Sequence, residues 1–252
     1  MQIFDFHLHP GYDFHADVLS PEDFVKGLLA HGITRASGSA IHKGDTNREL
    51  ADYAEVLPRL NREAYEMQLQ FPDFFSAGIH IHPDFVELSC REIAHYATKG
   101  VRLVGELVPY LMGWRSFADP RLWEILEVAE QHEMVLSFHP NKRPEDMTAM
   151  ISQFPHLPIV VAHLDGYGLF DFAMETMRSR ENVYFDISAH GTREGMLQEA
   201  VSRVGADRIL FGTDYPGYSP VPFIESVQNA AISTRDKEKI LYGNAARLLG
   251  IK

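Results

Sequence analysis

Two histidines near the start of the chain, His7 and His9, are the first residues whose type and spacing could do chemistry. They follow a mostly apolar stretch at 3–6, and Pro10-Gly11 comes directly after them. Side chains two residues apart on a strand point to the same face, and a Pro-Gly pair ends a strand. The two imidazoles would therefore converge at a strand end and form half of a metal site. A chain with 13 histidines can also produce such a pair by chance. The metal site is therefore supported only if the rest of the chain supplies further ligands.

Polar residues at the ends of later strands are the candidates for those ligands. Apolar runs predict eight strands, at 3–9, 33–41, 74–83, 100–107, 134–139, 158–163, 183–187 and 208–212. The polar residues at their ends are His80, His82, Glu106, His139, His163, Ser188, His190 and Asp214. Each of these residues also has a structural explanation. A buried histidine can be bonded to a backbone carbonyl, and a carboxylate can cap the next helix. This alternative stays open for Glu106 and His190.

Helical segments alternate with the strands and indicate the architecture that would bring these ends together. They are predicted at 21–31, 47–70, 85–96, 120–132, 144–154, 170–180, 193–204, 222–232 and 235–249, and Pro58 should kink or split the second. Eight strand–helix units in 252 residues predict a (β/α)8 TIM barrel, as a single domain over 1–252. An open doubly wound sheet is the competitor, but no Gly-x-Gly-x-x-Gly follows the first strand. In a barrel, the chemistry lies at the C-terminal face of the strands.

The ligand types at this face fit zinc or a similar divalent ion such as manganese. A bound metal lowers the pKa of its water to about 7 and so supplies hydroxide at neutral pH. Asp214, placed beside the metal, could take a proton from that water as a general base. His163 is placed to bind a second metal or to act on the substrate as a base or electrophile.

In these motifs the chain resembles the amidohydrolase superfamily, in particular the amidohydrolase-2 group of hydrolases and aromatic-acid decarboxylases. The matching segments are Phe4-Asp5-Phe6-His7-Leu8-His9, Gly105-Glu106, His139-Pro140, Ala162-His163-Leu164, 207–216 and 239–249. The resemblance implies that one metal is held by His7, His9, His139 and Asp214, while His163 acts near the substrate or binds a second metal.

The fourth strand departs from the common pattern of that superfamily. Many members carry a bridging carboxylated lysine there, but 101–107 has no lysine and has Glu106 instead. Gly-Glu at this place is similar to the TatD-type hydrolases, in which a glutamate bridges two metals, and Glu106 is therefore also a candidate ligand. The resemblance leaves the number of metals, one or two, undecided.

Loops after the strands should form the substrate pocket. Trp114 and Arg115 follow the fourth strand, Lys142 and Arg143 follow His139, and His190 follows the seventh strand. We expect these five residues to bind substrate, the cations by holding a carboxylate or phosphate. The alternative for the cations is that they are ordinary solvated loop charges.

Composition limits the partners. The formal net charge of −12 argues against a nucleic-acid partner and gives no attraction to an anionic membrane. Cys90 is the one cysteine, so no internal disulfide can form. No signal segment or membrane-spanning run is found. We expect a cytoplasmic protein with a small-molecule substrate, and the sequence leaves assembly into a homo-oligomer open.

The leading hypothesis is a metal-dependent hydrolase of an ester, lactone or amide bond in a small, acidic substrate. A non-oxidative decarboxylase of a small unsaturated or aromatic acid is the first alternative, because it would use the same ligands. A TatD-like phosphoester hydrolase and a non-catalytic ligand-binding barrel are the others. Release of carbon dioxide would indicate the decarboxylase, and water-dependent cleavage the hydrolase.

Overall fold

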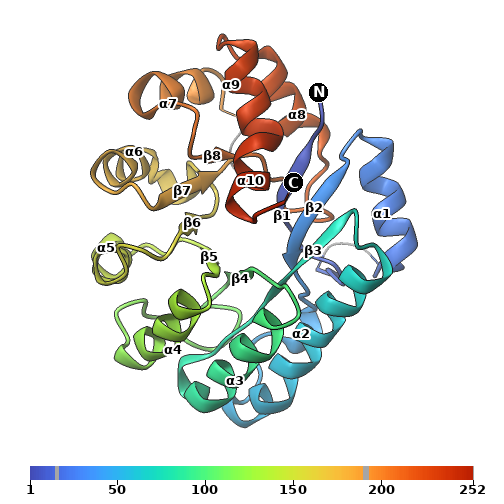
Figure 1. The fold of residues 1–252 in the computed structure, drawn as a ribbon, viewed down its shortest axis with the longest axis vertical. Coiled ribbons are helices and arrows are strands. Elements are labelled where there is room, and N and C mark those ends of the chain that lie inside the picture. The colour runs from blue at the N-terminus through green and yellow to red at the C-terminus, as the bar shows by residue number, and fades with distance from the viewer. Residues whose placement is uncertain (15–16, 190–192, 252) are drawn as a thin grey trace.

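Eight parallel strands follow one another around a barrel in sequence order in the computed structural model, which describes residues 1–14, 17–189 and 193–251 (Figure 1). The strands are β1 (Phe4–Leu8), β2 (Arg35–Ser39), β3 (Phe75–Ile79), β4 (Leu103–Leu107), β5 (Val135–Phe138), β6 (Ile159–Val161), β7 (Val183–Asp186) and β8 (Ile209–Leu210). Each pairs in parallel with the next one along the chain. The predicted (β/α)8 barrel is therefore confirmed.

The barrel is closed between its last and first strands by backbone hydrogen bonds that continue past the short β8. The amide of Phe6 donates to the carbonyl of Phe211 at 2.9 Å, and the amide of Asp214 donates to the carbonyl of His7 at 2.8 Å. The amide of His9 then donates to the carbonyl of Tyr215 at 2.9 Å. This closure fixes the backbone of Asp214 beside that of His7.

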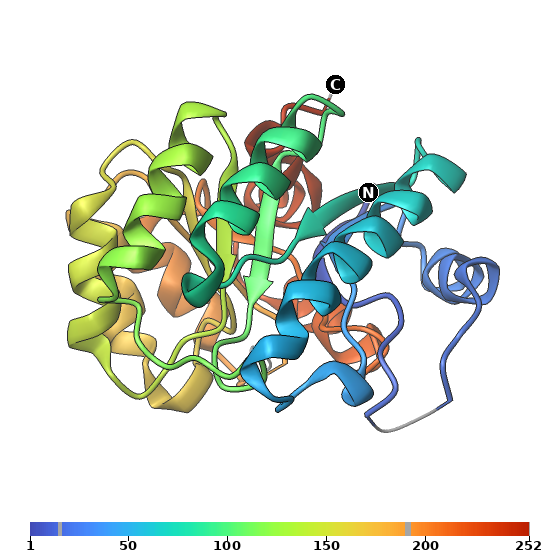
Figure 2. The same ribbon diagram turned by 90° about the horizontal axis from the view of Figure 1, so that it is seen from below.

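Helices form an outer ring around the strands (Figures 1 and 2). They are α1 (Pro21–Ala30), α2 (Tyr53–Gln70), α3 (Val86–Ala97), α4 (Pro120–Gln131), α5 (Pro144–Gln153), α6 (Phe170–Ser179), α7 (Met196–Val204), α8 (Val221–Asn229), α9 (Thr234–Glu238) and α10 (Asn244–Leu248). The start of α1 shows how sequence sets a boundary, since the Ser20 hydroxyl accepts from the amide of Asp23 at 3.1 Å and Pro21 fills the first position. None of the helices in the described ranges is long and apolar enough to cross a membrane.

The two longest predicted helices differ most from the structure. In the segment predicted at 47–70, the α-helix begins only at Tyr53. This helix, α2, continues through Pro58 without being split. The segment predicted at 235–249 is divided by a π-helical turn over Lys239–Gly243. After this turn the buried Asn244 side chain donates to the carbonyls of Ala206 and Ile209, which anchors α10 against the start of β8.

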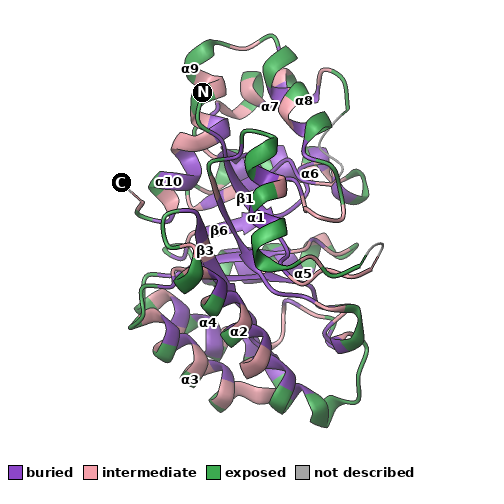
Figure 3. Ribbon diagram, turned by 90° about the vertical axis from the view of Figure 1, so that its right-hand side faces the viewer, coloured by how far each residue is buried: buried purple, intermediate pink, exposed green. Residues whose placement is uncertain are grey.

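Buried residues concentrate in the strands and on the inner sides of the helices (Figure 3). One apolar cluster contains residues from strands on opposite sides of the barrel and therefore fills its interior: Phe4, Phe6, Leu103, Val135, Val160 and Leu210. Residues of α10 and the segment after it, Ala245, Ala246 and Leu249, pack against this cluster. The interior is thus filled by apolar side chains, and polar chemistry is confined to the other end.

Register shifts in two strands change which side chains face the barrel interior. Leu103 belongs to the interior cluster, and strict alternation would point Glu106, three residues later, to the opposite side. The pairing of β4 with β5 shifts register between Val104 and Leu107, and that of β1 with β2 shifts between Asp5 and Leu8. Such irregularities re-aim side chains near functional sites, and here they bring Glu106 and His7 to the inside.

The buried side chain of Asn61 on α2 supports the end of β3. Its amide donates to the carbonyl of His80 at 3.1 Å, and its carbonyl oxygen accepts from the amide of His80 at 2.7 Å. We expect Asn61→Ala to lower the free energy of unfolding by about 2 kcal/mol, because it leaves both backbone groups buried without a partner. Urea denaturation would measure the change. Arg62→Ala, at the exposed neighbouring position, is the control, and equal stability of the two variants would contradict this account.

Candidate active site

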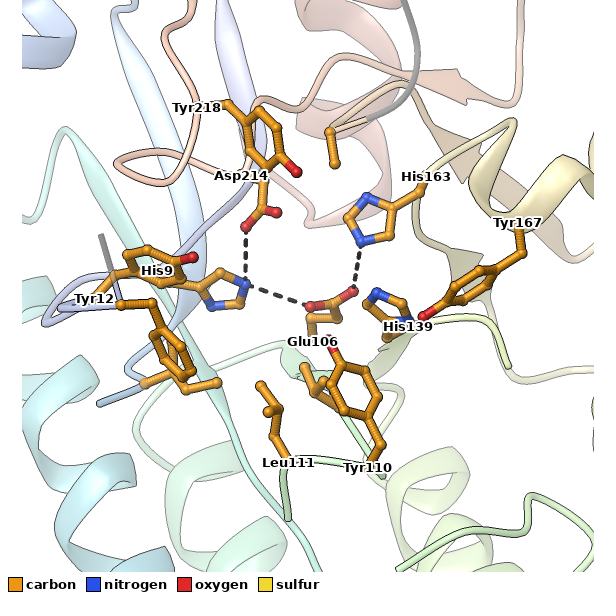
Figure 4. Close-up of a pocket in the computed structure, with 14 residues that line it drawn as sticks. His9, Tyr12, Glu106, Tyr110, Leu111, His139, His163, Tyr167, Asp214 and Tyr218 are labelled. Carbon is orange, nitrogen blue, oxygen red and sulfur yellow. Dashed lines mark ion pairs between the residues drawn. The ribbon is translucent and has the colours of Figure 1, made fainter. Parts of the chain in front are cut away.

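Six side chains from five different strand ends gather at the C-terminal face of the barrel. Figure 4 shows all of them except His7. They form three groups whose ligand atoms lie within 4.8 Å of one another: His7, His9 and Glu106; His7, His163 and Asp214; and Glu106, His139 and His163. We call these six residues the ligand cluster. All six were named as metal ligands from the sequence, and the fold brings every one of them into this cluster.

The Glu106 carboxylate lies at the centre of the ligand cluster (Figure 4). One of its oxygens, Oε2, lies 3.3 Å from Nε2 of His7 and 3.4 Å from Nε2 of His9. The other, Oε1, lies 3.4 Å from Nε2 of His163. Asp214 approaches from the opposite side, with Oδ1 3.5 Å from Nε2 of His9. The Nε2 atoms of three histidines therefore point at two carboxylates.

Hydrogen bonds behind the rings fix which nitrogen faces the cluster. Nδ1 of His9 lies 3.0 Å from the carbonyl of Ser39, and Nδ1 of His139 lies 2.8 Å from the carbonyl of Pro140. Because a carbonyl oxygen only accepts, the proton of each neutral ring is on Nδ1, and Nε2 presents its lone pair. This is the arrangement by which histidines bind metals.

Asp186, the last residue of β7, is the side chain that sequence reasoning missed. It is fully buried, and its Oδ2 accepts from Nδ1 of His7 at 2.9 Å. Its Oδ1 accepts from the backbone amides of His163 at 3.1 Å and Ser188 at 3.0 Å. One carboxylate thus orients a ligand from β1 and supports the backbone of another after β6. The available signal was an acidic residue ending an otherwise apolar strand.

Charge within the cluster is balanced internally. Burial disfavours the charged form of Glu106, but the attraction of His7 and the close approach of the His163 and His7 imidazoles hold the pKa of that carboxyl well below its usual range. Burial likewise disfavours charge on His7, yet Glu106 and Asp186 raise the pKa of its imidazole well above the usual value. Both groups are therefore stabilised in their charged forms by each other.

Two buried atoms at the centre have no hydrogen-bond partner within the described residues: Nε2 of His7 and Oε1 of Glu106. Buried polar atoms are rarely left in this state, and here both are of the type that ligates a metal. Imidazole nitrogens with carboxylate oxygens suit zinc, manganese or iron. On these observations the ligand cluster fits a divalent metal.

Backbone strain is also concentrated here. His163 and Asp214 have φ values of 59° and 65°, in the left-handed region that residues other than glycine seldom adopt. Each such residue costs on the order of 1 kcal/mol or more, and persists only where its surroundings impose it. The position of both side chains is therefore determined by the fold around them.

Other buried polar residues near the cluster have structural roles. Asp5 accepts from the amide and hydroxyl of Thr213 at 3.1 and 2.5 Å, and burial raises the pKa of its carboxyl to about 7. His80 is bonded through Nε2 to the carbonyl of Ala40, and burial lowers its pKa to about 4. His82 is bonded through Nε2 to the carbonyl of Met112. Neither of these two histidines belongs to a ligand group in the described part of the chain.

A cavity of about 390 Å³ opens above the ligand cluster. Its wall is largely aromatic, with four tyrosines and one phenylalanine around the cluster (Figure 4): Tyr12, Phe14, Tyr110, Tyr167 and Tyr218. No lysine or arginine is among the described residues that line it. Burial raises the pKa of Tyr12 to about 12, so its hydroxyl is a neutral hydrogen-bonding group.

Four of the five residues predicted to bind substrate lie outside this wall. Trp114 is buried, with 6% of its surface exposed, and Arg115 is exposed. Arg143 is paired with Asp146 at 3.3 Å, and Lys142 lies over the Tyr167 ring, with Nζ 5.2 Å from its centre.

His190 falls outside the described residues. The loops do supply the cavity wall, as expected, but with tyrosines in place of the predicted cations. The substrate-binding role of those five residues stays a prediction.

The fold and the ligand cluster together define a (β/α)8 barrel built around a divalent-metal site. The profile of a family described as Amidohydrolase matches residues 4–251, and the chain therefore belongs to that amidohydrolase family.

Sequence similarity to a curated protein is confined to a short segment. A gamma-resorcylate decarboxylase from Polaromonas sp. (strain JS666 / ATCC BAA-500) is 40% identical over 68 residues, which is 27% of this chain and 21% of that protein. The match thus spans about a fifth of the relative's length.

Solved structures match over almost the whole chain at low sequence identity. A 2,6-dihydroxybenzoate decarboxylase in complex with 2,6-dihydroxybenzoate gives a TM-score of 0.80 at 18% identity and covers 99% of each chain. A dihydroxybenzoic acid decarboxylase from Polaromonas sp. JS666, with bound manganese and the inhibitor 2-nitroresorcinol, gives 0.76 at 16% identity, covering 98% of this chain and 96% of the other. At such identity these likenesses establish the fold.

The position of Glu106 in two of the three ligand groups predicts that its removal changes metal binding. We expect metal content per chain to fall in Glu106→Ala, measured by elemental analysis of protein purified without added metal or chelator. About two equivalents in the unmodified protein, falling towards one, would mean that Glu106 bridges two ions. About one equivalent in the unmodified protein, falling well below one in Glu106→Ala, would mean that Glu106 is a ligand of a single ion. Glu55→Ala, at an exposed position, is the control, and unchanged content in Glu106→Ala would show that Glu106 is not a ligand.

Asp186 should affect metal affinity without touching the metal. Groups that orient a ligating histidine typically contribute roughly 10- to 100-fold in affinity, so we expect Asp186→Asn to weaken metal binding by about that factor. Competition with a chelator of known affinity would measure it. Asp73→Asn, which is exposed, should bind like the unmodified protein. Equal affinity of the two variants would mean that Asp186 does not orient His7.

Proposed function

We propose that this protein is a metal-dependent, non-oxidative decarboxylase of a small hydroxylated aromatic acid. The observation that carries the proposal is the cavity, in which an aromatic wall, with no lysine or arginine among its described residues, stands over a cluster of metal-ligating side chains. The named activity of the similar proteins supports it, since each of those described above is a decarboxylase of such an acid.

The cavity suits a flat ring that carries polar groups. Tyr110 and Tyr167 both stand beside His139, with ring centres 5.3 and 5.7 Å from that of the imidazole. Their rings offer faces on which an aromatic ring can stack, and their hydroxyls can bond to phenolic groups. The volume lies within the range of small-molecule sites. With no cation in the described wall, the charge of an acid group must be met at the ligand cluster.

His7, His9 and Glu106 would hold a divalent ion, and the other two ligand groups share His7 or Glu106 with this one and add Asp214, His139 and His163. When bound, such an ion supplies positive charge that binds the acid group of the substrate and draws electrons from the ring. The metal identity, zinc or manganese, is part of this proposal, and manganese is present in the similar Polaromonas structure.

The reaction breaks the bond between the ring carbon and the carboxylate carbon. The electron pair stays on the ring carbon, that carbon takes up one proton, and carbon dioxide leaves. Asp214 would deliver the proton, because it lines the cavity and its side chain is 18% exposed to solvent. His163, with 3% of its side chain exposed and Nε2 towards Glu106, would hold and orient the substrate.

A hydrolase, which the sequence placed first, would use the same side chains, with Asp214 taking a proton from water. Geometry alone does not separate the two reactions. The comparisons favour the decarboxylase, and the product decides between them.

The decisive assay incubates metal-loaded protein with 2,6-dihydroxybenzoate in deuterated water. We expect carbon dioxide, and resorcinol with one deuterium on the ring carbon that lost the carboxylate. Asp214→Asn should lower kcat by roughly 100-fold or more, the usual contribution of a general acid, while Asp73→Asn should retain activity. A related acid, 5-carboxyvanillate, tests the breadth of the substrate class. Cleavage of esters or lactones without any carbon dioxide from aromatic acids would overturn the proposal.

A further inference from the structure

A second cavity, of about 280 Å³, lies at the opposite end of the barrel from the ligand cluster. Its lining includes the first residue of each of three neighbouring strands, Arg35 of β2, Phe75 of β3 and Leu103 of β4. Leu249 and Ile251, near the end of the chain, line it as well. In Figure 2 the β4 arrow points away from the end of the barrel at which the C-terminus lies. We call this the basal cavity.

The basal cavity is positively charged. Arg35, Lys99 and Arg102 all line it, and no aspartate or glutamate is among its described lining residues. The chain as a whole carries 35 acidic residues against 23 lysines and arginines. The basal cavity therefore has the opposite charge to the molecule as a whole, which has an excess of acidic residues.

The donor groups of Arg102 are only partly used. Its Nη1 lies 3.8 Å from the Glu133 carboxylate, but the Glu133 side chain is 82% exposed, and such a pair is weak. Its Nε is buried and has no hydrogen-bond partner within the described residues. A buried donor without an acceptor is costly, so Arg102 is incompletely bonded, and its side chain, which is 42% exposed, leaves other donors of the guanidinium accessible to an acceptor oxygen.

The neighbouring side chains add donors but few acceptors. Nζ of Lys99 lies 4.8 Å from the centre of the Tyr65 ring, whose face attracts the ammonium and keeps it at the cavity. Oε1 of Gln68 already accepts from the amide of Ala77 at 2.8 Å, which leaves its NH₂ group as a donor. A ligand that matches this lining is rich in acceptor oxygens and negatively charged.

Arginines that line another cavity of this protein are paired with an acidic residue, unlike Arg35 in the basal cavity. On the outer side of α2, Arg48 and Arg59 line a cavity together with Asp45. Both arginines pair with Asp45, at 3.6 and 2.5 Å. Positive charge there is neutralised within the chain, whereas in the basal cavity Arg35 has no ion pair with any described residue.

We propose that the basal cavity binds a small organic oxyanion, a phosphate or carboxylate with a short apolar part. The guanidinium groups of Arg35 and Arg102 hold the anionic head by charge-assisted hydrogen bonds. The side chains of Leu69, which is 61% exposed, and of Ile251, which is half-buried, give the apolar part a surface to cover. The site is separate from the ligand cluster and independent of the reaction that takes place there.

Calorimetric titration of metal-loaded protein with inorganic phosphate, and separately with propionate, at constant ionic strength tests the proposal. We expect saturable binding of at least one anion, weakened tenfold or more in the double variant Arg35→Gln/Arg102→Gln. The double variant Arg62→Gln/Arg91→Gln removes the same charge from exposed positions and should bind like the unmodified protein. Binding of phosphate alone identifies a phosphorylated ligand, and binding of propionate alone identifies a carboxylate.

Anion binding at the ligand cluster would survive in Arg35→Gln/Arg102→Gln, so equal affinity in both double variants would overturn the proposal. Absence of saturable binding of either anion to the unmodified protein would overturn it too. If the double variant fails to fold, Arg102→Lys keeps the charge but loses the planar guanidinium with its Nε donor. It should bind at least threefold more weakly than the unmodified protein, and unchanged binding would count against the site.

Discussion

The buried carboxylate of Glu106 is the constraint on which the site depends. A charge inside the barrel is tolerated only when partners surround it, and here the partners are imidazoles from β1 and from the end of β6. Those imidazoles need their own support, which Asp186 gives to His7 and the Ser39 carbonyl gives to His9. Both ligands from β1 are thus held by groups from other strands, β7 and β2. The closed barrel is what brings these strands within reach of one another.

Much of this could be predicted from the sequence, because in a parallel barrel every strand ends at the same face. Apolar runs located the eight strands, and the polar residue at each end was then a candidate ligand. Four candidate ligands could be proposed without any knowledge of packing, because they stand at the ends of apolar runs: His7, His9, His139 and Asp214. The predicted boundaries erred where a local feature intervened, as at the π-helical turn Lys239–Gly243.

The sequence could not reveal what depends on geometry between strands. Asp186 lies inside the strand predicted at 183–187, and its bond to His7 joins residues 179 apart in the chain. The register shift in β4 brings Glu106 inside the barrel, and strict alternation would have placed it on the other face. The cavity wall was assigned to Arg115 and Lys142 because charge suggests binding. Loop conformation instead places Tyr110 and Tyr167 there.

The absence of cations from the described cavity wall bears on how a reaction cycle would finish. The tyrosines of the described wall bring no positive charge with which to retain an acid, so the acid would be held at one point only, the ligand cluster. Removing the carboxylate would remove that single hold, and a neutral phenol would keep only stacking and hydrogen bonds. Affinity would then fall in the same step that breaks the carbon–carbon bond. In such an enzyme, turnover itself loosens the product, and accumulated product competes weakly with fresh substrate.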